Sequence, residues 1–124
     1  MVSLEEVKLA LNNLNNITLS TPLELIDSYS NLFSSNVYVK REDLQITRSF
    51  KIRGSFNKIL SLSRDQKENG IVCSSAGNHA QGVSFSCNKL KIKGTIFMPN
   101  TTPSIKVKKV KEFGGKYIKV KLVG

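Results

Sequence analysis

The second half of the chain alternates strand-like and helix-like segments, and this alternation restricts the fold more than any other feature. Short apolar runs rich in β-branched residues occupy 71–73, 95–98 and 117–123, and stretches of helical length separate them. A strand–helix–strand–helix–strand order is typical of a parallel sheet covered by its crossover helices. The sequence therefore predicts an α/β fold with a parallel βαβ sheet.

Local signals set the helix limits in this half. We expect one helix from Ser75 to about Leu90. Thr102 before Pro103 predicts a cap followed by proline at the first helical position, and Gly114-Gly115 predicts the end of that second helix. The residues expected on its inner side are Ile105, Val110 and Phe113.

The first half contains two helices with recognisable starts. Ser3 and Glu6 have the spacing of a capping box, and a second helix is expected from Ser49 to about Ser63. Between them, 21–23 should be extended because of Pro22, 37–40 should be a strand, and 67–70 should be a loop. The apolar stripes expected on the two helices are Leu4, Val7, Leu11 and Leu14 on the first and Ile52, Phe56, Ile59 and Leu60 on the second.

A polar turn follows the strand at 71–73. Ligands in open α/β sheets bind beyond the carboxyl ends of the strands, and Ser74–Gln81 occupies such a place. The free N–H groups of the following helix can bind an anion, Ser75 and Asn78 add polar side chains, and Gly77 lets a ligand approach the backbone. Serine-rich helix starts are also common without a ligand, so both interpretations stay open at this point.

Lys51 lies in the first turn of the helix that begins after Ser49. A lysine there is ordinarily solvated, and a cation is mildly unfavourable at the positive end of a helix. The same positive end, together with burial, favours the neutral amine, which is the nucleophilic form. Position alone leaves both interpretations open.

Positive charge is concentrated near the C-terminal end. The net charge is +10, and residues 88–124 hold ten lysines, no arginine and one acidic residue, Glu112. A basic third of a chain can bind nucleic acid, but arginine, which forks onto phosphates, is absent from it. We expect a solvated lysine-rich surface and no nucleic-acid partner, with a small basic nucleic-acid-binding module as the alternative of another class.

Cys73 and Cys87 have neither zinc-type spacing nor the pattern of a disulfide framework, so we expect two buried thiols and no metal. No apolar run approaches the ~18 residues of a membrane span. The first ten residues lack the basic start and apolar run of a signal peptide. These features predict a cytoplasmic protein with no membrane partner.

Three blocks, in this order and spacing, resemble the threonine dehydratase family of fold-type II pyridoxal-phosphate enzymes. They are Lys40-Arg41-Glu42-Asp43-Leu44-Gln45, Ser49-Phe50-Lys51-Ile52-Arg53-Gly54 and the segment from Ser74 to Gly82. The likeness continues through Met98-Pro99, Thr102-Pro103, Lys106-Val107 and Gly114-Gly115, and it extends from about Thr21 to Gly124. The fold that it implies is the N-terminal part of the tryptophan synthase β-like architecture.

The resemblance implies roles for residues of both motifs. Lys51 would form the Schiff base with pyridoxal 5′-phosphate, Phe50 would pack at the cofactor ring, and Asn78 would hydrogen-bond the ring hydroxyl. The loop that holds the substrate carboxylate would consist of Ser75, Ala76, Gly77, Asn78 and His79. His79, the only histidine, would be a structural neighbour of the site, with an acid–base role as the alternative.

The implied reaction converts L-threonine to 2-oxobutanoate and ammonia, in isoleucine biosynthesis or threonine catabolism. Pyridoxal phosphate would act as the electron sink, and the freed amine of Lys51 would take the α-proton. Serine dehydratase and serine racemase, acting on L-serine, are the alternatives within the family, and the Arg41–Gln45 block favours threonine dehydratase. The complete protein is expected to be a homo-oligomer.

Departures from the family pattern indicate a fragment. Ser55 stands where the family usually has alanine. The glycine-rich phosphate loop is absent, because no glycine run exceeds Gly114-Gly115, and so is the late serine or cysteine that faces the pyridine nitrogen. We expect residues 1–70 to belong to an incomplete large domain and residues 71–124 to an incomplete small domain. The Lys51 helix should then lack cover for its stripe, and the chain alone should be inactive and prone to association.

Overall fold

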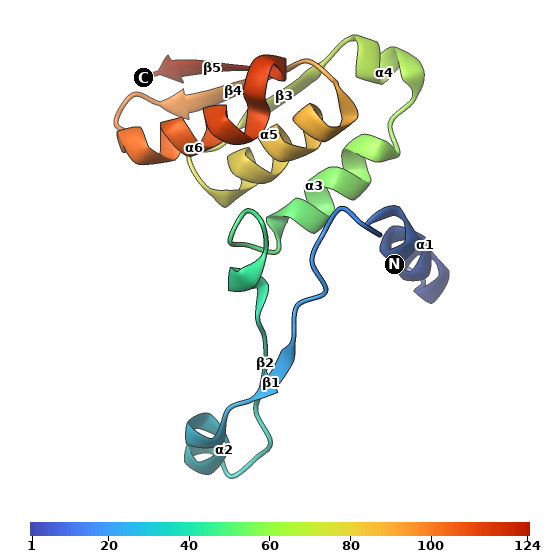
Figure 1. Ribbon diagram of the computed structural model, residues 1–124, viewed down its shortest axis with the longest axis vertical. Coiled ribbons are helices and arrows are strands. Elements are labelled where there is room, and N and C mark those ends of the chain that lie inside the picture. The colour runs from blue at the N-terminus through green and yellow to red at the C-terminus, as the bar shows by residue number, and fades with distance from the viewer.

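A body of three strands and several helices carries a long two-stranded arm (Figure 1). The computed structural model describes all residues from 1 to 124. In chain order the elements are α1 (Leu4–Asn13), β1 (Leu23–Leu25), α2 (Asp27–Phe33), β2 (Tyr38–Lys40), the 3-10 turn η1 (Glu42–Leu44), α3 (Lys51–Leu60), α4 (Arg64–Glu68), β3 (Ile71–Ser74), α5 (Asn78–Leu90), β4 (Gly94–Pro99), α6 (Ser104–Gly114), the 3-10 turn η2 (Gly115–Tyr117) and β5 (Ile118–Val123).

The sheet consists of β3, β4 and β5 in this spatial order, and all three strands run parallel. The register places Cys73 opposite Ile96 and Ile96 opposite Val120, so these side chains share one face. α5 and α6 cover that face (Figure 1), and Ile96 and Met98 of β4 and Val110 of α6 are fully buried between the sheet and these helices. The predicted α/β fold with a parallel βαβ sheet is confirmed.

The opposite face of the sheet is open to solvent. Val72 on β3 is 74% exposed. The ammonium group of Lys121 on β5 lies 5.4 Å from the centre of the Phe97 ring on β4. Parallel sheets are ordinarily covered on both faces, whereas the hydrophobic core of this chain lies on one side of its sheet.

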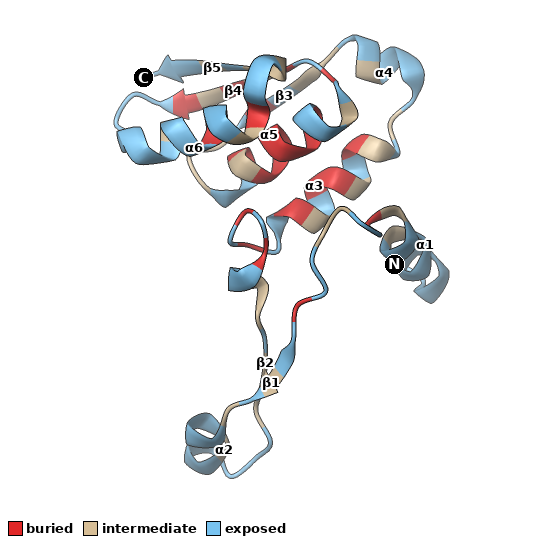
Figure 2. Cartoon of the chain, viewed as in Figure 1, coloured by how far each residue is buried: buried red, intermediate tan, exposed pale blue.

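Helix α3 packs on α5, and the two run side by side with their N-terminal ends at the same end of the body (Figure 1). Ile52, Phe56 and Ile59 are only 0%, 3% and 4% exposed, and Figure 2 shows buried residues on both helices. The expectation that this stripe lacks cover is therefore wrong. The covering surface comes from α5 within the same chain.

The arm is a hairpin of β1 and β2 with α2 at its tip (Figure 1). The strands are antiparallel, with Leu23 opposite Lys40 and Leu25 opposite Tyr38. Most residues of the arm are exposed (Figure 2), including the large apolar side chains of Leu23, Leu25, Tyr29, Leu32, Phe33 and Tyr38. Sequence analysis missed α2, since Ile26 at its start provides no capping side chain.

Several predicted limits need correction. α3 ends at Leu60 and not near Ser63, because Ser63 caps the separate helix α4 by accepting the N–H of Gln66 at 3.2 Å. α4 also occupies part of 67–70, which was expected to be a loop. α6 begins at Ser104, and Thr102 does not cap it, since its hydroxyl has no hydrogen-bond partner.

Two predicted stripes are only partly correct. The capping box of Ser3 and Glu6 is confirmed, but α1 has no buried residue, and only Leu14, directly after its end, is buried among the expected stripe. On α6, Val110 is buried, whereas Ile105 is 68% exposed. The inner face of α6 is set by its contact with α5, where Phe113 meets Phe85 edge-on with the ring centres 6.3 Å apart.

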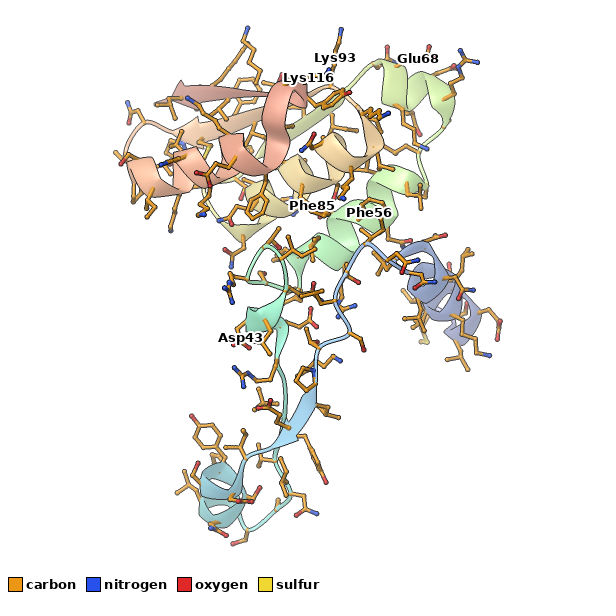
Figure 3. The ribbon with its side chains drawn as sticks, viewed as in Figure 1. Asp43, Phe56, Glu68, Phe85, Lys93 and Lys116 are labelled. Carbon is orange, nitrogen blue, oxygen red and sulfur yellow. The ribbon has the colours of Figure 1, made fainter.

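The expected burial of the two thiols and the expected exposure of the lysines are confirmed. Cys73 and Cys87 are free and buried, and burial raises the pKa of both thiols, that of Cys87 to about 11. All ten lysines of residues 88–124 are exposed, and Figure 3 shows Lys93 and Lys116 at the outer side of the body. Each helix is too short or too polar to cross a lipid bilayer.

Candidate active site

Lys51 is the first residue of α3, and its amine is exposed. Its backbone N–H donates to the hydroxyl of Ser49 at 3.2 Å, but the N-cap of α3 is Phe50, which provides no capping side chain, so Ser49 stands one residue before the N-cap and not at it. The amine itself forms no hydrogen bond or ion pair within the chain, and it lies 5.2 Å from the centre of the Phe50 ring. The amine of Lys51 is therefore free to react. Its exposure means that this chain does not provide the burial that would favour the neutral amine.

The turn after β3 leaves backbone donors free at the start of α5. Gly77 precedes that helix and provides no capping side chain. The N–H groups of Asn78, His79 and Ala80 donate to no acceptor in the chain. Ser75 holds the turn in place, since its N–H donates to the carbonyl of Phe97 at 3.1 Å. Free N–H groups at the positive end of a helix bind anions, so this helix start is suited to a carboxylate or phosphate.

Gly82 allows α3 and α5 to touch backbone to backbone. A Cβ atom at this position would lie 3.2 Å from the backbone nitrogen of Ile52 and 3.2 Å from the carbonyl carbon of Lys51. One turn further along α5, the hydroxyl of Ser86 lies 3.5 Å from that of Ser55. The first turn of α3 is therefore fixed directly against α5.

Asn78 lies four residues before Gly82 and thus on the same face of α5. That face is the one in contact with the first turn of α3, so the start of α5 and Lys51 lie at the same end of the helix pair (Figure 1). Two positive helix ends in one place favour a bound anion. The two motifs that the sequence singled out are brought together in this way.

His79 occupies a different part of this region. It borders a hollow of about 370 Å³ between α3 and β3, with Gly54, Ser55, Lys58, Ser74 and Val83 among the other lining residues. Lys51, Phe50 and Asn78 line none of the hollows on the surface. No shared cavity therefore joins His79 to the amine of Lys51.

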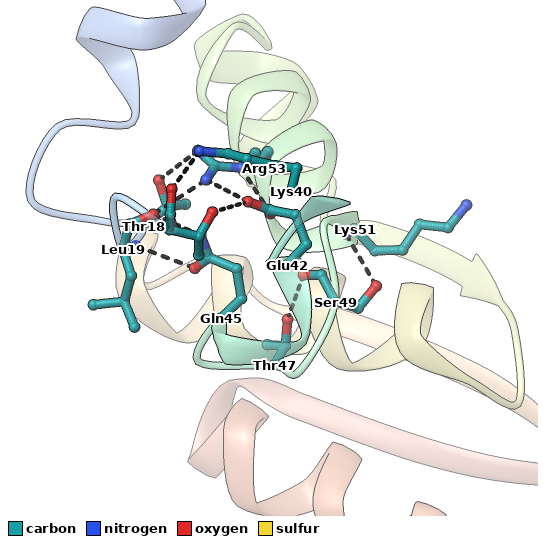
Figure 4. Close-up of polar contacts among 10 residues, drawn as sticks. Thr18, Leu19, Lys40, Glu42, Gln45, Thr47, Ser49, Lys51 and Arg53 are labelled. Atoms are coloured by element: carbon teal, nitrogen blue, oxygen red, sulfur yellow. Dashed lines mark hydrogen bonds and ion pairs between the residues drawn. The ribbon is translucent and has the colours of Figure 1, made fainter. Parts of the chain in front are cut away.

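Sequence analysis missed a polar cluster around Arg53, two residues after Lys51. The guanidinium of Arg53 forks onto the carboxylate of Glu42, with N–O distances of 2.9 and 2.8 Å. It also donates to the hydroxyl of Thr18 at 3.3 Å and to the carbonyl of Leu19 at 3.1 Å, while Thr21 donates to Glu42 at 2.6 Å. We call these five residues the Arg53 clamp (Figure 4).

The clamp shifts the pKa values of both of its charged groups, Glu42 and Arg53. The hydrogen bonds from Arg53, and to a lesser extent from Thr21, hold the pKa of Glu42 below its usual range although burial opposes this. The same pairing raises the pKa of Arg53. A carboxyl whose pKa is lower in the folded chain than the unfolded value near 4.5 contributes stability above that value, and the contribution is lost as the pH falls.

We expect the urea midpoint of the wild-type chain to fall more steeply than that of Glu42→Gln as the pH is lowered from about 6 to about 3. At neutral pH the substitution should destabilise the chain by about 1–3 kcal/mol, because charge-assisted hydrogen bonds to Arg53 are lost. Glu68→Gln is the control, since Glu68 pairs with Arg64 at the surface. Parallel pH profiles for wild type and Glu42→Gln would contradict the assignment.

A lysine amine without a hydrogen bond or ion pair and a helix start with free N–H groups thus lie at the same end of α3 and α5, after the carboxyl end of β3. The family of pyridoxal-phosphate dependent enzymes matches the chain over residues 15–123. The chain belongs to this family, which has the fold-type II architecture, and the resemblance stated from the sequence is confirmed.

Individual relatives are similar along the whole chain. L-threonine dehydratase biosynthetic IlvA of Halalkalibacterium halodurans is 49% identical over 123 residues, which are 99% of this chain and 30% of the relative. The protein of the same name from Bacillus subtilis is 48% identical over 124 residues, which are 100% of this chain and 29% of the relative. The chain thus spans about 30% of the length of these curated relatives.

Solved structures show the same fold. The processed form of threonine deaminase isoform 2 from Solanum lycopersicum has a TM-score of 0.79 and 38% identity, covering 99% of this chain and 34% of that one. Maize serine racemase has a TM-score of 0.86 and 28% identity, covering 99% of this chain and 37% of that one. Both amino-acid specificities that the sequence left open therefore occur among similar structures.

The residues present fit pyridoxal phosphate. Its aldehyde needs an unpaired amine, and the amine of Lys51 has no partner in the chain. The carboxylate of an amino acid needs free donors, which the N–H groups of Asn78, His79 and Ala80 provide. The side of the site that would hold the phosphate with a glycine-rich loop has no counterpart in this sequence.

Proposed function

We propose that the chain is the N-terminal part of a pyridoxal-phosphate-dependent L-threonine dehydratase, which converts L-threonine to 2-oxobutanoate and ammonia in isoleucine biosynthesis. The observation that carries the proposal is the free amine of Lys51 at the shared N-terminal end of α3 and α5, where Asn78, His79 and Ala80 leave their N–H groups unpaired.

Threonine is favoured over serine by the degree of similarity. Relatives named threonine dehydratases are 46–49% identical to the chain, whereas the similar serine racemases are 28–30% identical. L-Serine is the alternative substrate.

Each site residue has a proposed task. Lys51 would hold the cofactor covalently, and its amine would accept the proton from the substrate Cα. Phe50 packs at the cofactor ring, Asn78 hydrogen-bonds the ring hydroxyl, and the backbone of Ser75–His79 binds the substrate carboxylate. Bound pyridoxal phosphate supplies the electron sink that makes the Cα proton acidic.

The remaining proposals concern the whole protein. Residues 1–70 belong to one domain and residues 71–124 to another, and the complete protein is a cytoplasmic homo-oligomer. The apolar side chains exposed on the arm and on the open sheet face, such as Leu32 and Val72, support the need for further covering surface. The buried free thiols are in keeping with a reducing compartment.

We expect borohydride reduction in the presence of pyridoxal phosphate to label Lys51 in preference to the other lysines. Lys51 stands at the end of α3 that meets the start of α5 with its free N–H groups, whereas Lys58, exposed on the same helix, stands about two turns further along. Peptide mapping by mass spectrometry gives the label at each lysine, and Lys51→Arg is the control that keeps the charge. Label confined to other lysines would remove Lys51 from its proposed role.

Substrate choice is tested in a chimera. This chain replaces the matching segment of the Bacillus subtilis relative, and release of 2-oxobutanoate from threonine is compared with release of pyruvate from serine. We expect threonine deamination in the chimera, none in its Lys51→Arg variant, and none in the isolated chain, which lacks a phosphate loop. A folded chimera that holds the cofactor and deaminates only serine would overturn the threonine assignment.

A further inference from the structure

We propose that Arg53 and Glu42 are positioning residues that set the place of Lys51, an inference that rests on the proposed function of Lys51. Arg53 follows Lys51 by two residues in the same first turn of α3, and Figure 4 shows the side chain of Lys51 pointing away from the clamp. The clamp therefore holds the backbone that carries the amine without using the amine itself.

The clamp joins three stretches of chain that are far apart in the sequence. Arg53 on α3 reaches Thr18 and Leu19, which precede the arm, and Glu42, which follows it. Because the bidentate fork fixes both distance and orientation, it prevents α3 from rotating about its axis relative to these stretches. A turn of α3 about its axis would move the amine of Lys51 away from the start of α5.

The chain between Glu42 and Lys51 is also held in place. Gln45 is 1% exposed; its side chain accepts the N–H of Leu19 at 3.1 Å and donates to the carbonyl of Leu19 at 2.7 Å. Thr47 is buried too, and its hydroxyl donates to the carbonyl of Ser49 at 3.4 Å. The segment leading into the helix is thus ordered by side-chain hydrogen bonds at several successive points.

The burial of the Arg53–Glu42 pair also supports a positioning role. The side chains of Arg53 and Glu42 are 28% and 14% exposed, in contrast to the pair of Arg64 and Glu68 on α4, which is 89% and 63% exposed. A largely buried, bidentate pair is geometrically restrictive, whereas an exposed pair on one helix has little influence on structure. The chain therefore contains its own matched control.

The test compares two double variants that leave the net charge unchanged, Glu42→Gln/Arg53→Met and Arg64→Met/Glu68→Gln. Two readouts are taken on the full chain at a temperature where all variants are folded by circular dichroism. Hydrogen exchange of the amides of residues 49–54 reports on the helix start without any cofactor. The ratio of pyridoxal-phosphate label at Lys51 to that at Lys58 reports on the amine.

We expect faster exchange at 49–54 and a fall of about tenfold in the Lys51-to-Lys58 ratio in the first variant only, since small misplacements of reacting groups have effects of up to about 100-fold. Unchanged exchange at 49–54 overturns the proposal. A labelling ratio that is preserved while exchange rises also overturns it, since the pair is then only structural. A wild-type chain that labels Lys51 no better than Lys58 counts against the proposed function, and the exchange result still decides whether the pair fixes the helix start.

Discussion

Gly82→Val is expected to destabilise the chain by about 3 kcal/mol or more, because overpacking a tight contact forces the surrounding structure to move. Any Cβ atom at this position would come within 3.2 Å of the backbone of Lys51 and Ile52 and within 2.7 Å of the Ser55 hydroxyl. α3 must then separate from α5, which should also abolish the preferential labelling of Lys51. Urea unfolding followed by circular dichroism measures the stability.

Gly54→Val provides the matched control in the partner helix. A Cβ atom at Gly54 meets nothing within 4 Å, so the same substitution should change stability by only about 0.5 kcal/mol. If the two valine variants unfold at the same urea concentration, α3 and α5 do not meet at Gly82 as described.

Ile96→Ala is expected to destabilise the chain by about 2–5 kcal/mol, through lost burial and the cavity that remains. Ile96 is fully buried in the central strand β4 and belongs to the core between the sheet, α5 and α6. Total stabilities of ~5–15 kcal/mol are usual for domains, so this substitution should remove a large part of the total. The urea midpoint at neutral pH measures the effect.

Val72→Ala is the control for Ile96→Ala. Val72 is a β-branched residue on the neighbouring strand, but its side chain points to the open face and is 74% exposed. Its truncation should change the free energy of unfolding by about 0.5 kcal/mol at most. Equal effects at the two positions would show that the sheet is covered on both faces.

The features predicted correctly are those whose signals are local. The alternation of β-branched runs with helical stretches predicts the parallel sheet, and short-range capping patterns such as Ser3 with Glu6 predict helix starts. The expected start near Ser49 is close to the observed one at Lys51, where the Ser49 hydroxyl accepts the Lys51 N–H, although Phe50 is the N-cap. Local patterns therefore locate the elements and place Lys51 at a helix start.

The features that were missed depend on contacts between distant residues. The Arg53 clamp joins residues 35 positions apart, and no local pattern identifies Thr18 as a partner of Arg53. Gly82 belonged to a recognised motif, but its role in bringing α3 onto α5 appears only once the two helices are packed. The same holds for Ile105, whose helical spacing does not say which face α6 turns toward α5.

We expect the arm to open independently of the body. Its backbone hydrogen bonds are few, and its apolar side chains make little contact with the body (Figure 2). Isolated two-stranded hairpins are marginally stable in water, and regions with few buried contacts open at a small fraction of the global unfolding free energy. Amide protons of β1 and β2 therefore exchange from a locally open state in which β4 and α5 are still folded. Since the Arg53 clamp stands at the base of the arm, it marks the boundary at which this local opening stops before it reaches Lys51.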